Sequence, residues 1–156
     1  MKKMISLLLA LALVLGLAAC GAKPEAAAPV SIDVNALYDS YAQHMPDMFF
    51  PDDDTLMNFL GINIADCAQY KVAICAEGMR SDEVWLIEAK DQAALEALQQ
   101  LAQTRIQSKL EETVTYAPDQ YVVVEKAEVL VNGLYLALLI SPEVETLKAG
   151  FEAALQ

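Results

Sequence analysis

The chain is poor in the residues that bind metals, cross-link small domains or attract nucleic acids. Its 156 residues include three cysteines, one histidine and one tryptophan, and 10 basic residues stand against 22 acidic ones. There is no CxxC pair and no cluster of cysteine with histidine, which argues strongly against a zinc site of the ordinary kind. The net charge of −12 repels nucleic acid. Composition therefore argues against a nucleic-acid partner.

Long hydrophobic runs are absent except at the N terminus. Met1-Lys2-Lys3 is followed by an apolar run over residues 4–19, which is shorter than the roughly 20 residues needed to cross a bilayer. A positive start, a short apolar run and small residues at its end are typical of an export signal. The run ends in Leu17-Ala18-Ala19-Cys20, which resembles the bacterial lipobox. We therefore expect residues 1–19 to be removed as a lipoprotein signal peptide and Cys20 to carry a covalent diacylglycerol. The alternatives are an ordinary signal peptide with a chance cysteine and a spanning anchor.

Residues 20–32 contain "GAKPEAAAP", which has two prolines and no apolar periodicity. Such a segment cannot bury enough apolar area to offset its chain entropy, so we expect a flexible tether of about 20 Å. Two acyl chains give stable attachment to a membrane. Gly21 is not the aspartate that retains lipoproteins in an inner membrane, which favours the outer face of the cell membrane. Without residues 1–19 the net charge becomes −14.

Residues 33–156 are long enough for one domain with its own core. Asp33 is a capping candidate, and Val34, Leu37, Tyr41 and Met45 share one helical face. A second, short helix is expected from Thr55 to Gly61, a glycine suited to end it.

Alternating residues in "QYKVAICAE" and "EVWLIEAK" predict a β-hairpin. A long helix is expected over 91–112, with Asp91 as its cap. Asn132-Gly133 predicts a type I′ turn between two further strands, and Ser141-Pro142 predicts the start of the last helix. The order α-α-β-β-α-β-β-α predicts an α+β fold, with a four-stranded antiparallel sheet (two hairpins) covered by helices on one face.

The remaining cysteines, Cys67 and Cys75, leave three alternatives open. In an exported protein they are a candidate disulfide, they can remain free thiols, or they can act as a redox pair. Active redox pairs usually lie in a CxxC at the start of a helix, whereas Cys75 lies within a predicted strand.

Asp52, Asp53 and Asp54 are weak candidates for a divalent cation such as calcium, although no EF-hand spacing is present. The more ordinary interpretation is that Asp53 or Asp54 caps the helix starting at Thr55 and that the others favour its positive end. His44, the single imidazole, follows the first helix and has no nucleophile at a suggestive spacing.

Aromatic residues divide into core and surface candidates. Tyr70, Trp85, Tyr135 and Phe151 fall within predicted strands and helices and are expected in the core. Tyr116 and Tyr121 flank Pro118 in a predicted loop, so we expect them to form an exposed contact surface.

The chain resembles small lipoproteins of Gram-positive anaerobes that carry the domain of unknown function 4358. The resemblance covers about 34–156. It rests on the lipobox, "DDDTLMNFLGI", Tyr70, "YAPDQY" and "NGLYLALLIS". Members often carry an aromatic residue where Leu60 stands here. The resemblance assigns no activity, no cofactor and no functional residues.

Taken together, the sequence predicts a lipid-anchored extracytoplasmic protein that is not an enzyme. Its domain is expected to bind an unknown protein or a small molecule at the cell envelope, with no cofactor besides the lipid on Cys20. The alternatives are a metal-assisted hydrolase or divalent-cation-binding protein that uses Asp52–Asp54, and a thiol-based redox protein.

Overall fold

A computed structural model describes residues 31–156. The predicted signal peptide (1–19), Cys20 and most of the tether lie outside the described residues. In chain order, the elements are α2 (Val34–Tyr41), η1 (Ala42–His44), β1 (Met48–Phe49), α3 (Asp53–Thr55), η2 (Leu56–Leu60), η3 (Ile64–Asp66), β2 (Cys67–Cys75), β3 (Glu83–Ala89), α4 (Gln92–Tyr116), α5 (Pro118–Val124), β4 (Glu128–Asn132), β5 (Tyr135–Ile140) and α6 (Val144–Ala154).

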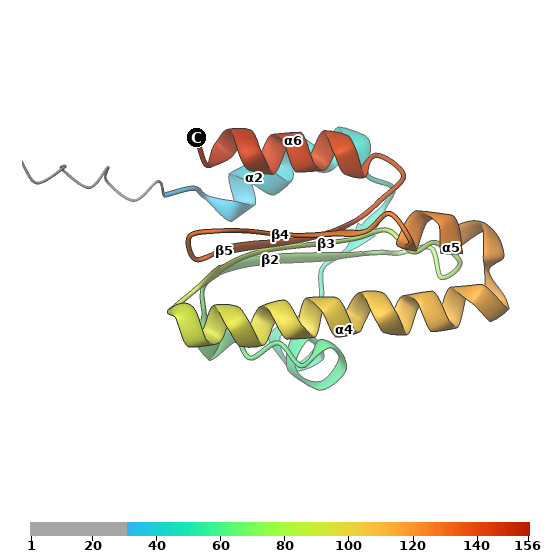
Figure 1. The fold of residues 1–156 in the computed structure, drawn as a ribbon, viewed down its shortest axis with the longest axis horizontal. Coiled ribbons are helices and arrows are strands. Elements are labelled where there is room, and N and C mark those ends of the chain that lie inside the picture. The colour runs from blue at the N-terminus through green and yellow to red at the C-terminus, as the bar shows by residue number, and fades with distance from the viewer. Residues whose placement is uncertain (1–30) are drawn as a thin grey trace, which may run out of the picture.

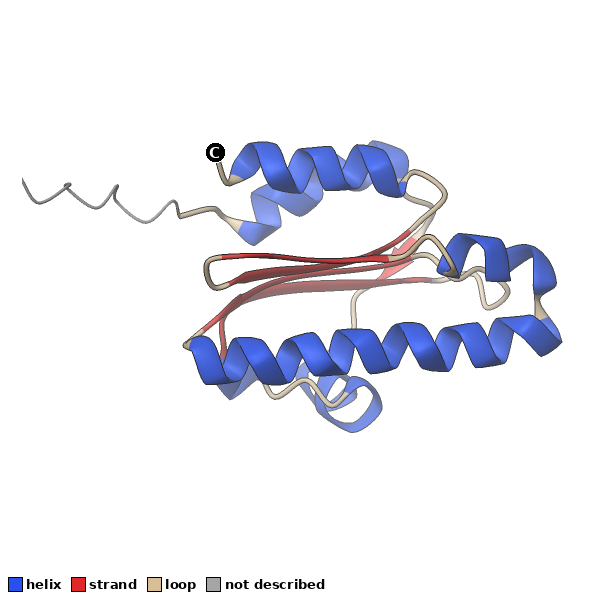
Figure 2. Cartoon of the chain, in the orientation of Figure 1, coloured by secondary structure: helices blue, strands red, loops and turns tan. Residues whose placement is uncertain are grey.

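The predicted α+β class and antiparallel sheet are confirmed, but the sheet has five strands rather than four. Their order is β1-β2-β3-β5-β4, and all neighbours are antiparallel. Both predicted hairpins are present, and β3 pairs with β5 to join them (Figure 2). The additional strand, β1, pairs only Met48 with Cys75 and Phe49 with Ile74. Two residues are too few to show an alternating pattern in the sequence.

Helices cover both faces of the sheet, so the prediction of helices on one face is wrong. In Figure 1, α2 and α6 lie on one face while α4 runs along the other. The cause is visible in β5, whose six residues are all buried. A strand that is apolar on both sides needs cover on both sides.

Each face therefore has its own core. The core on the α4 side contains Trp85, Ile87 and Leu98, whereas the core on the α6 side contains Val84, Leu86 and Leu147. The alternation along β3 thus sends Trp85 and Ile87 to one layer and Val84 and Leu86 to the other, as the sequence pattern predicted. No helix among the described residues is long and apolar enough to cross a membrane.

Local signals at helix ends are largely confirmed. The Asp33 carboxylate accepts a hydrogen bond from the backbone N–H of Asn35 at 2.8 Å, and Asp91 accepts one from Ala94 at 2.9 Å. Gly61 ends η2 with φ of 75°, a left-handed conformation that favours glycine. The long helix runs four residues further than predicted, to Tyr116, and the segment from Pro118, predicted as a loop, forms α5 instead.

The hairpin turn between β4 and β5 differs from the predicted type I′ turn. Asn132 is the last residue of β4 and pairs with Tyr135, so the two turn residues are Gly133 and Leu134. Gly133 has a φ of 58°, and among residues 31–156 no residue other than a glycine has a positive φ. A positive φ at the first turn position alone is the pattern of a type II′ turn.

The last helix also starts later than predicted. Ser141 accepts a hydrogen bond from the backbone N–H of Glu143 at 3.1 Å, but this bond closes a turn that contains Pro142. The α-helix begins at Val144.

Candidate functional site

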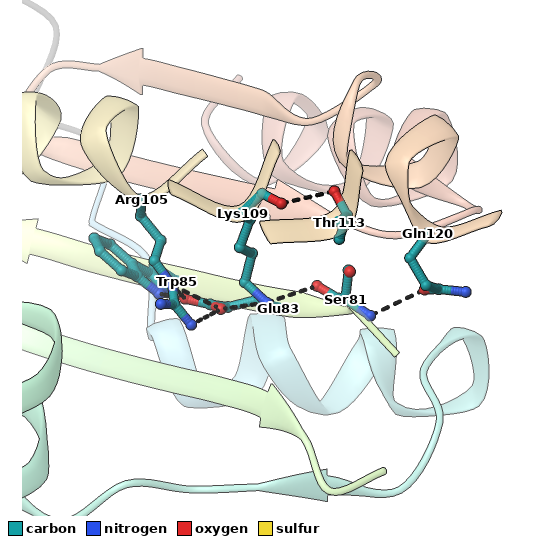
Figure 3. A network of polar contacts seen from close by, with 7 residues as sticks. All are labelled: Ser81, Glu83, Trp85, Arg105, Lys109, Thr113 and Gln120. Atoms are coloured by element: carbon teal, nitrogen blue, oxygen red, sulfur yellow. Dashed lines mark hydrogen bonds and ion pairs between the residues drawn. The ribbon is translucent and has the colours of Figure 1, made fainter. Parts of the chain in front are cut away.

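The most unusual feature of the domain is a buried carboxylate that contacts two basic side chains. Glu83, the first residue of β3, is fully buried. It lies on the α4 face of the sheet because it alternates with Trp85. Arg105 and Lys109 project from α4 one turn apart, which places them on the same side of the helix. Figure 3 shows the three side chains meeting between β3 and α4.

The Glu83 carboxylate accepts hydrogen bonds from Arg105 and Trp85 and forms an ion pair with Lys109. Arg105 donates from Nη2 to Oε2 at 2.9 Å and from Nε to Oε1 at 3.1 Å. Lys109 Nζ lies 3.2 Å from Oε2, and Trp85 Nε1 donates to Oε1 at 2.8 Å. Such saturation offsets the desolvation of a buried ion pair. Every buried side-chain nitrogen and oxygen among the described residues has a hydrogen-bond partner.

A second set of hydrogen bonds fixes this group to its neighbours. Lys109 Nζ also donates to the backbone carbonyl of Ser81 at 3.3 Å, and the Thr113 hydroxyl donates to the carbonyl of Lys109 at 2.7 Å. The Ser81 N–H donates to the Gln120 side-chain oxygen at 3.0 Å. These bonds connect the start of β3, the second half of α4 and α5 (Figure 3).

A pocket of about 260 Å³ opens beside this network. It lies between the turn at 76–82, the second half of α4 and η2. Arg80, Arg105 and Lys109 line it, and Arg105 lies over the Phe59 ring at 5.3 Å from its centre. We call this space the Arg105 pocket.

Arg80 extends the basic lining toward solvent. Its guanidinium donates to both carboxylate oxygens of buried Asp82, at 3.0 and 3.2 Å. The hydrogen bonds with Asp82 raise the pKa of Arg80 above its ordinary value. Arg80 and Asp82 thus form a closed, neutral pair at the edge of the pocket.

The two predicted contact tyrosines are separated by the structure. Tyr116 is the last residue of α4, is highly exposed and lines the Arg105 pocket. Tyr121 lies in α5, is partly buried and is not among the lining residues. Tyr116 is therefore exposed as predicted, but both tyrosines belong to helices rather than to a loop, and their role in a contact surface stays a prediction.

The aspartate segment is engaged in local hydrogen bonds. Asp52, rather than Asp53 or Asp54, is the helix cap and accepts from the Thr55 N–H at 2.9 Å. Hydrogen bonds from Thr55 lower the pKa of Asp52. Asp53 accepts from the Tyr70 hydroxyl at 2.6 Å, and this bond raises the pKa of Tyr70. Among residues 31–156, no group of three or more acidic, histidine or cysteine side chains is arranged to hold a metal ion.

The cysteines cannot form the candidate disulfide in this fold. Cys67 and Cys75 occupy opposite ends of β2 and are both free. Eight residue steps at about 3.3 Å each separate their α-carbons by about 26 Å, whereas a disulfide requires less than about 7 Å. Burial, together with nearby Asp66, raises the pKa of Cys67 to about 11.

His44 contacts an acidic residue rather than a nucleophile. Its Nδ1 lies 2.8 Å from a carboxylate oxygen of Glu143, just before α6. The contact connects η1 to the start of the last helix.

The sequence analysis missed Glu83, Arg105 and Lys109. Arg105 and Lys109 each precede an apolar residue of the long helix, Ile106 and Leu110, and long basic side chains on a helix normally reach solvent. The available signal was the position of Glu83, which lies on the same face of the strand as Trp85, Ile87 and Ala89, all of them apolar. A carboxylate at a core position requires a buried basic partner.

Comparison with known proteins places the chain in a family. No curated protein and no solved structure matches the chain. A protein-family model matches residues 42–141, which include the whole sheet, α4 and every residue of the Glu83 network. Since this match covers well over half of the 156 residues, the chain belongs to the family described as Domain of unknown function (DUF4358).

Proposed function

We propose that this protein is an exported lipoprotein whose domain is a non-catalytic binding module at the cell envelope. In this proposal a diacylglycerol on Cys20 attaches the chain to the outer face of the cell membrane. The tether of residues 20–32 then connects the anchor to the domain formed by residues 33–156.

The observation that carries the proposal is the sequence Leu17-Ala18-Ala19-Cys20 after a short apolar run. The small residues before the cysteine suit a peptidase groove, and the cysteine supplies the thiolate that is alkylated. Because the two acyl chains would provide the attachment, the domain itself needs no membrane-binding surface.

The Arg105 pocket supports a binding role for the domain. Two of its basic side chains, Arg105 and Lys109, are held in place by Glu83, which is fully buried and also accepts a hydrogen bond from Trp85. A carboxylate in that position orients Arg105 and Lys109 and cannot touch a reacting atom in the pocket. Fixed donors in a preformed pocket favour recognition over proton transfer.

Metabolic labelling with radioactive palmitate tests the anchor. We expect label in the wild-type chain and in a Cys67→Ser variant, and none in a Cys20→Ser variant. Protease added to intact cells should degrade the labelled protein, because the domain would lie outside. Label that persists in Cys20→Ser, or full protection from protease, would contradict the proposal.

A further inference from the structure

We propose that the Arg105 pocket binds a small organic anion in which a carboxylate adjoins an apolar group. The inference rests on the proposed role of the domain as a binding module and names the class of ligand.

The first support is the charge balance of the buried network. Glu83 contributes one negative charge, while Arg105 and Lys109 contribute two positive charges. The side chain of Glu83 is 0% exposed, that of Lys109 10% and that of Arg105 18%. The group therefore carries one net positive charge where water has little access. An uncompensated charge is costly in such a place, and a ligand carboxylate would balance it.

The other charged residues of the pocket do not remove this excess. Arg80 is already paired with Asp82. Glu77 and Glu112 line the pocket but are exposed. Neither forms an ion pair with Arg80, Arg105 or Lys109 in the part of the chain that the structure describes. Water and salt weaken the effect of exposed charges, so the field of the two carboxylates only partly offsets the buried charge.

The second support is the set of donors that remain free. Arg105 uses Nε and Nη2 for Glu83, and its Nη1 bonds to no described residue. Since no buried side-chain nitrogen among residues 31–156 lacks a partner, Nη1 is accessible to solvent, and Arg105 is one of the residues that line the pocket. Lys109 donates one hydrogen bond, to the Ser81 carbonyl, and its ammonium group lies 3.2 Å from Glu83 Oε2. Guanidinium and ammonium donors that converge in this way suit a carboxylate.

The third support is the apolar rim. Phe59, Met79 and Tyr116 line the pocket and are 65%, 70% and 77% exposed. Large apolar side chains around a few placed polar groups are typical of small-molecule sites. The volume of about 260 Å³ is near the lower end of the range of about 300–1,000 Å³ for such sites, so the ligand is small.

The test compares 3-phenylpropionate with its neutral analogue 3-phenylpropionamide. The chain has a single tryptophan, so a ¹⁵N spectrum of the full chain in detergent contains one indole signal. That signal reports on the site because Trp85 Nε1 bonds to Glu83. We expect the carboxylate to shift it and to bind at least about tenfold more tightly than the amide, as charge-assisted hydrogen bonds require. Equal binding, or no shift with either compound, would overturn the proposal.

Variants at exposed positions locate the site without threatening the fold. Glu112→Gln removes a negative charge from the pocket and should tighten binding of 3-phenylpropionate by about two- to threefold. The matched control is Glu111→Gln, an exposed neighbour outside the pocket, which should change affinity much less. Equal effects of the two variants would contradict a site at Arg105.

A second pair of variants tests the apolar rim. Tyr116→Ala should weaken binding, whereas Val114→Ala, which removes an exposed apolar side chain outside the pocket, should not. If Tyr116→Ala leaves affinity unchanged, the ligand does not occupy the rim and the proposal is wrong. Palmitate labelling of Cys20 is independent of these titrations. A failure of the proposed ligand class can therefore be distinguished from a failure of the proposed lipid anchor.

Discussion

At the scale of single residues, Glu83 is where burial and charge conflict most strongly. A carboxylate that is fully buried is tolerated only while its donors are present, because an unpaired buried charge is costly. Its basic partners come from a helix more than 20 positions away in the sequence, so no local pattern could indicate which basic residues would meet it.

We predict that Arg105→Gln lowers the free energy of unfolding by about 3 kcal/mol, near the lower end of the range for breaking a buried pair because Lys109 remains. Denaturant unfolding monitored by Trp85 fluorescence measures the effect. Lys90→Gln, which removes a basic residue from an exposed pair with Asp66, is the control and should change stability little. Equal effects of the two substitutions would show that Glu83 does not depend on Arg105.

Gly150 is a second residue at which two effects oppose each other. Alanine favours helix by about 1 kcal/mol over glycine, but a Cβ at Gly150 would lie 2.8 Å from Cε1 of Tyr41. Tyr41 is buried and donates from its hydroxyl to the Leu147 carbonyl at 2.8 Å, so it cannot move away easily. Overpacking of this kind costs about 1–3 kcal/mol.

We therefore predict that Gly150→Ala lowers the thermal midpoint of unfolding, with a net loss of about 1 kcal/mol. Gly78→Ala is the control, because a Cβ there meets no atom within 4 Å. A Gly150→Ala variant as stable as the wild type would show that α2 and α6 are packed less closely than the structure indicates.

At the scale of elements, the sequence predicts those features of helices and strands that are determined by residues close together in the chain. The caps at Asp33 and Asp91 and the alternation of β2 and β3 follow from residue type and spacing alone. The Asn132-Gly133 pair predicted the hairpin, but the turn type was wrong, since pairing between β4 and β5 continues through Asn132. The register of the strands is set by which side chains are buried on each face of the sheet. The Asn132-Gly133 pair alone carries no information about that burial.

The candidate site could be predicted only in part, for a related reason. Tyr116 was recognisable as exposed because it precedes a proline in a polar segment. Arg105 and Lys109 were not recognisable as buried, since long basic side chains on a helix normally reach solvent. Their burial arises because α4 extends to Tyr116, past the start of β3, and α5 then folds back against it.

The cap of the α3–η2 segment gives a prediction about pH. In the folded protein, hydrogen bonds from Thr55 lower the pKa of Asp52 below its ordinary value of 3.8. A lowered folded-state pKa stabilises the fold above pH 3.8 and ceases to do so as the pH falls through the folded-state value. Asp52→Asn retains a capping side chain but does not titrate.

We therefore expect the wild type to lose stability relative to Asp52→Asn as the pH is lowered from 5 to below about 3.8. Denaturant titrations at several pH values measure the difference. Asp54→Asn, at an exposed position that does not cap the helix, should follow the wild type. Parallel pH profiles for the wild type and Asp52→Asn would contradict the assignment of the cap.

At the scale of the whole molecule, the cysteines report on both the fold and the anchor. With Cys67 and Cys75 at opposite ends of β2 and Cys20 alkylated, the protein unfolded without reductant should expose two reactive thiols. Because burial raises the pKa of Cys67 to about 11, this thiol should react slowly in the native state near pH 8. If the thiols react only after reduction, Cys67 and Cys75 are not free as the structure indicates. If three thiols react, Cys20 does not carry a lipid.

The central claim concerns the sulfur of Cys20, and the mass of the intact protein purified from its own cells tests it most directly. The account predicts a chain that begins at Cys20 and carries the added mass of a diacylglycerol on that residue. A chain that retains residues 1–19, or one whose Cys20 is an unmodified thiol, would contradict it.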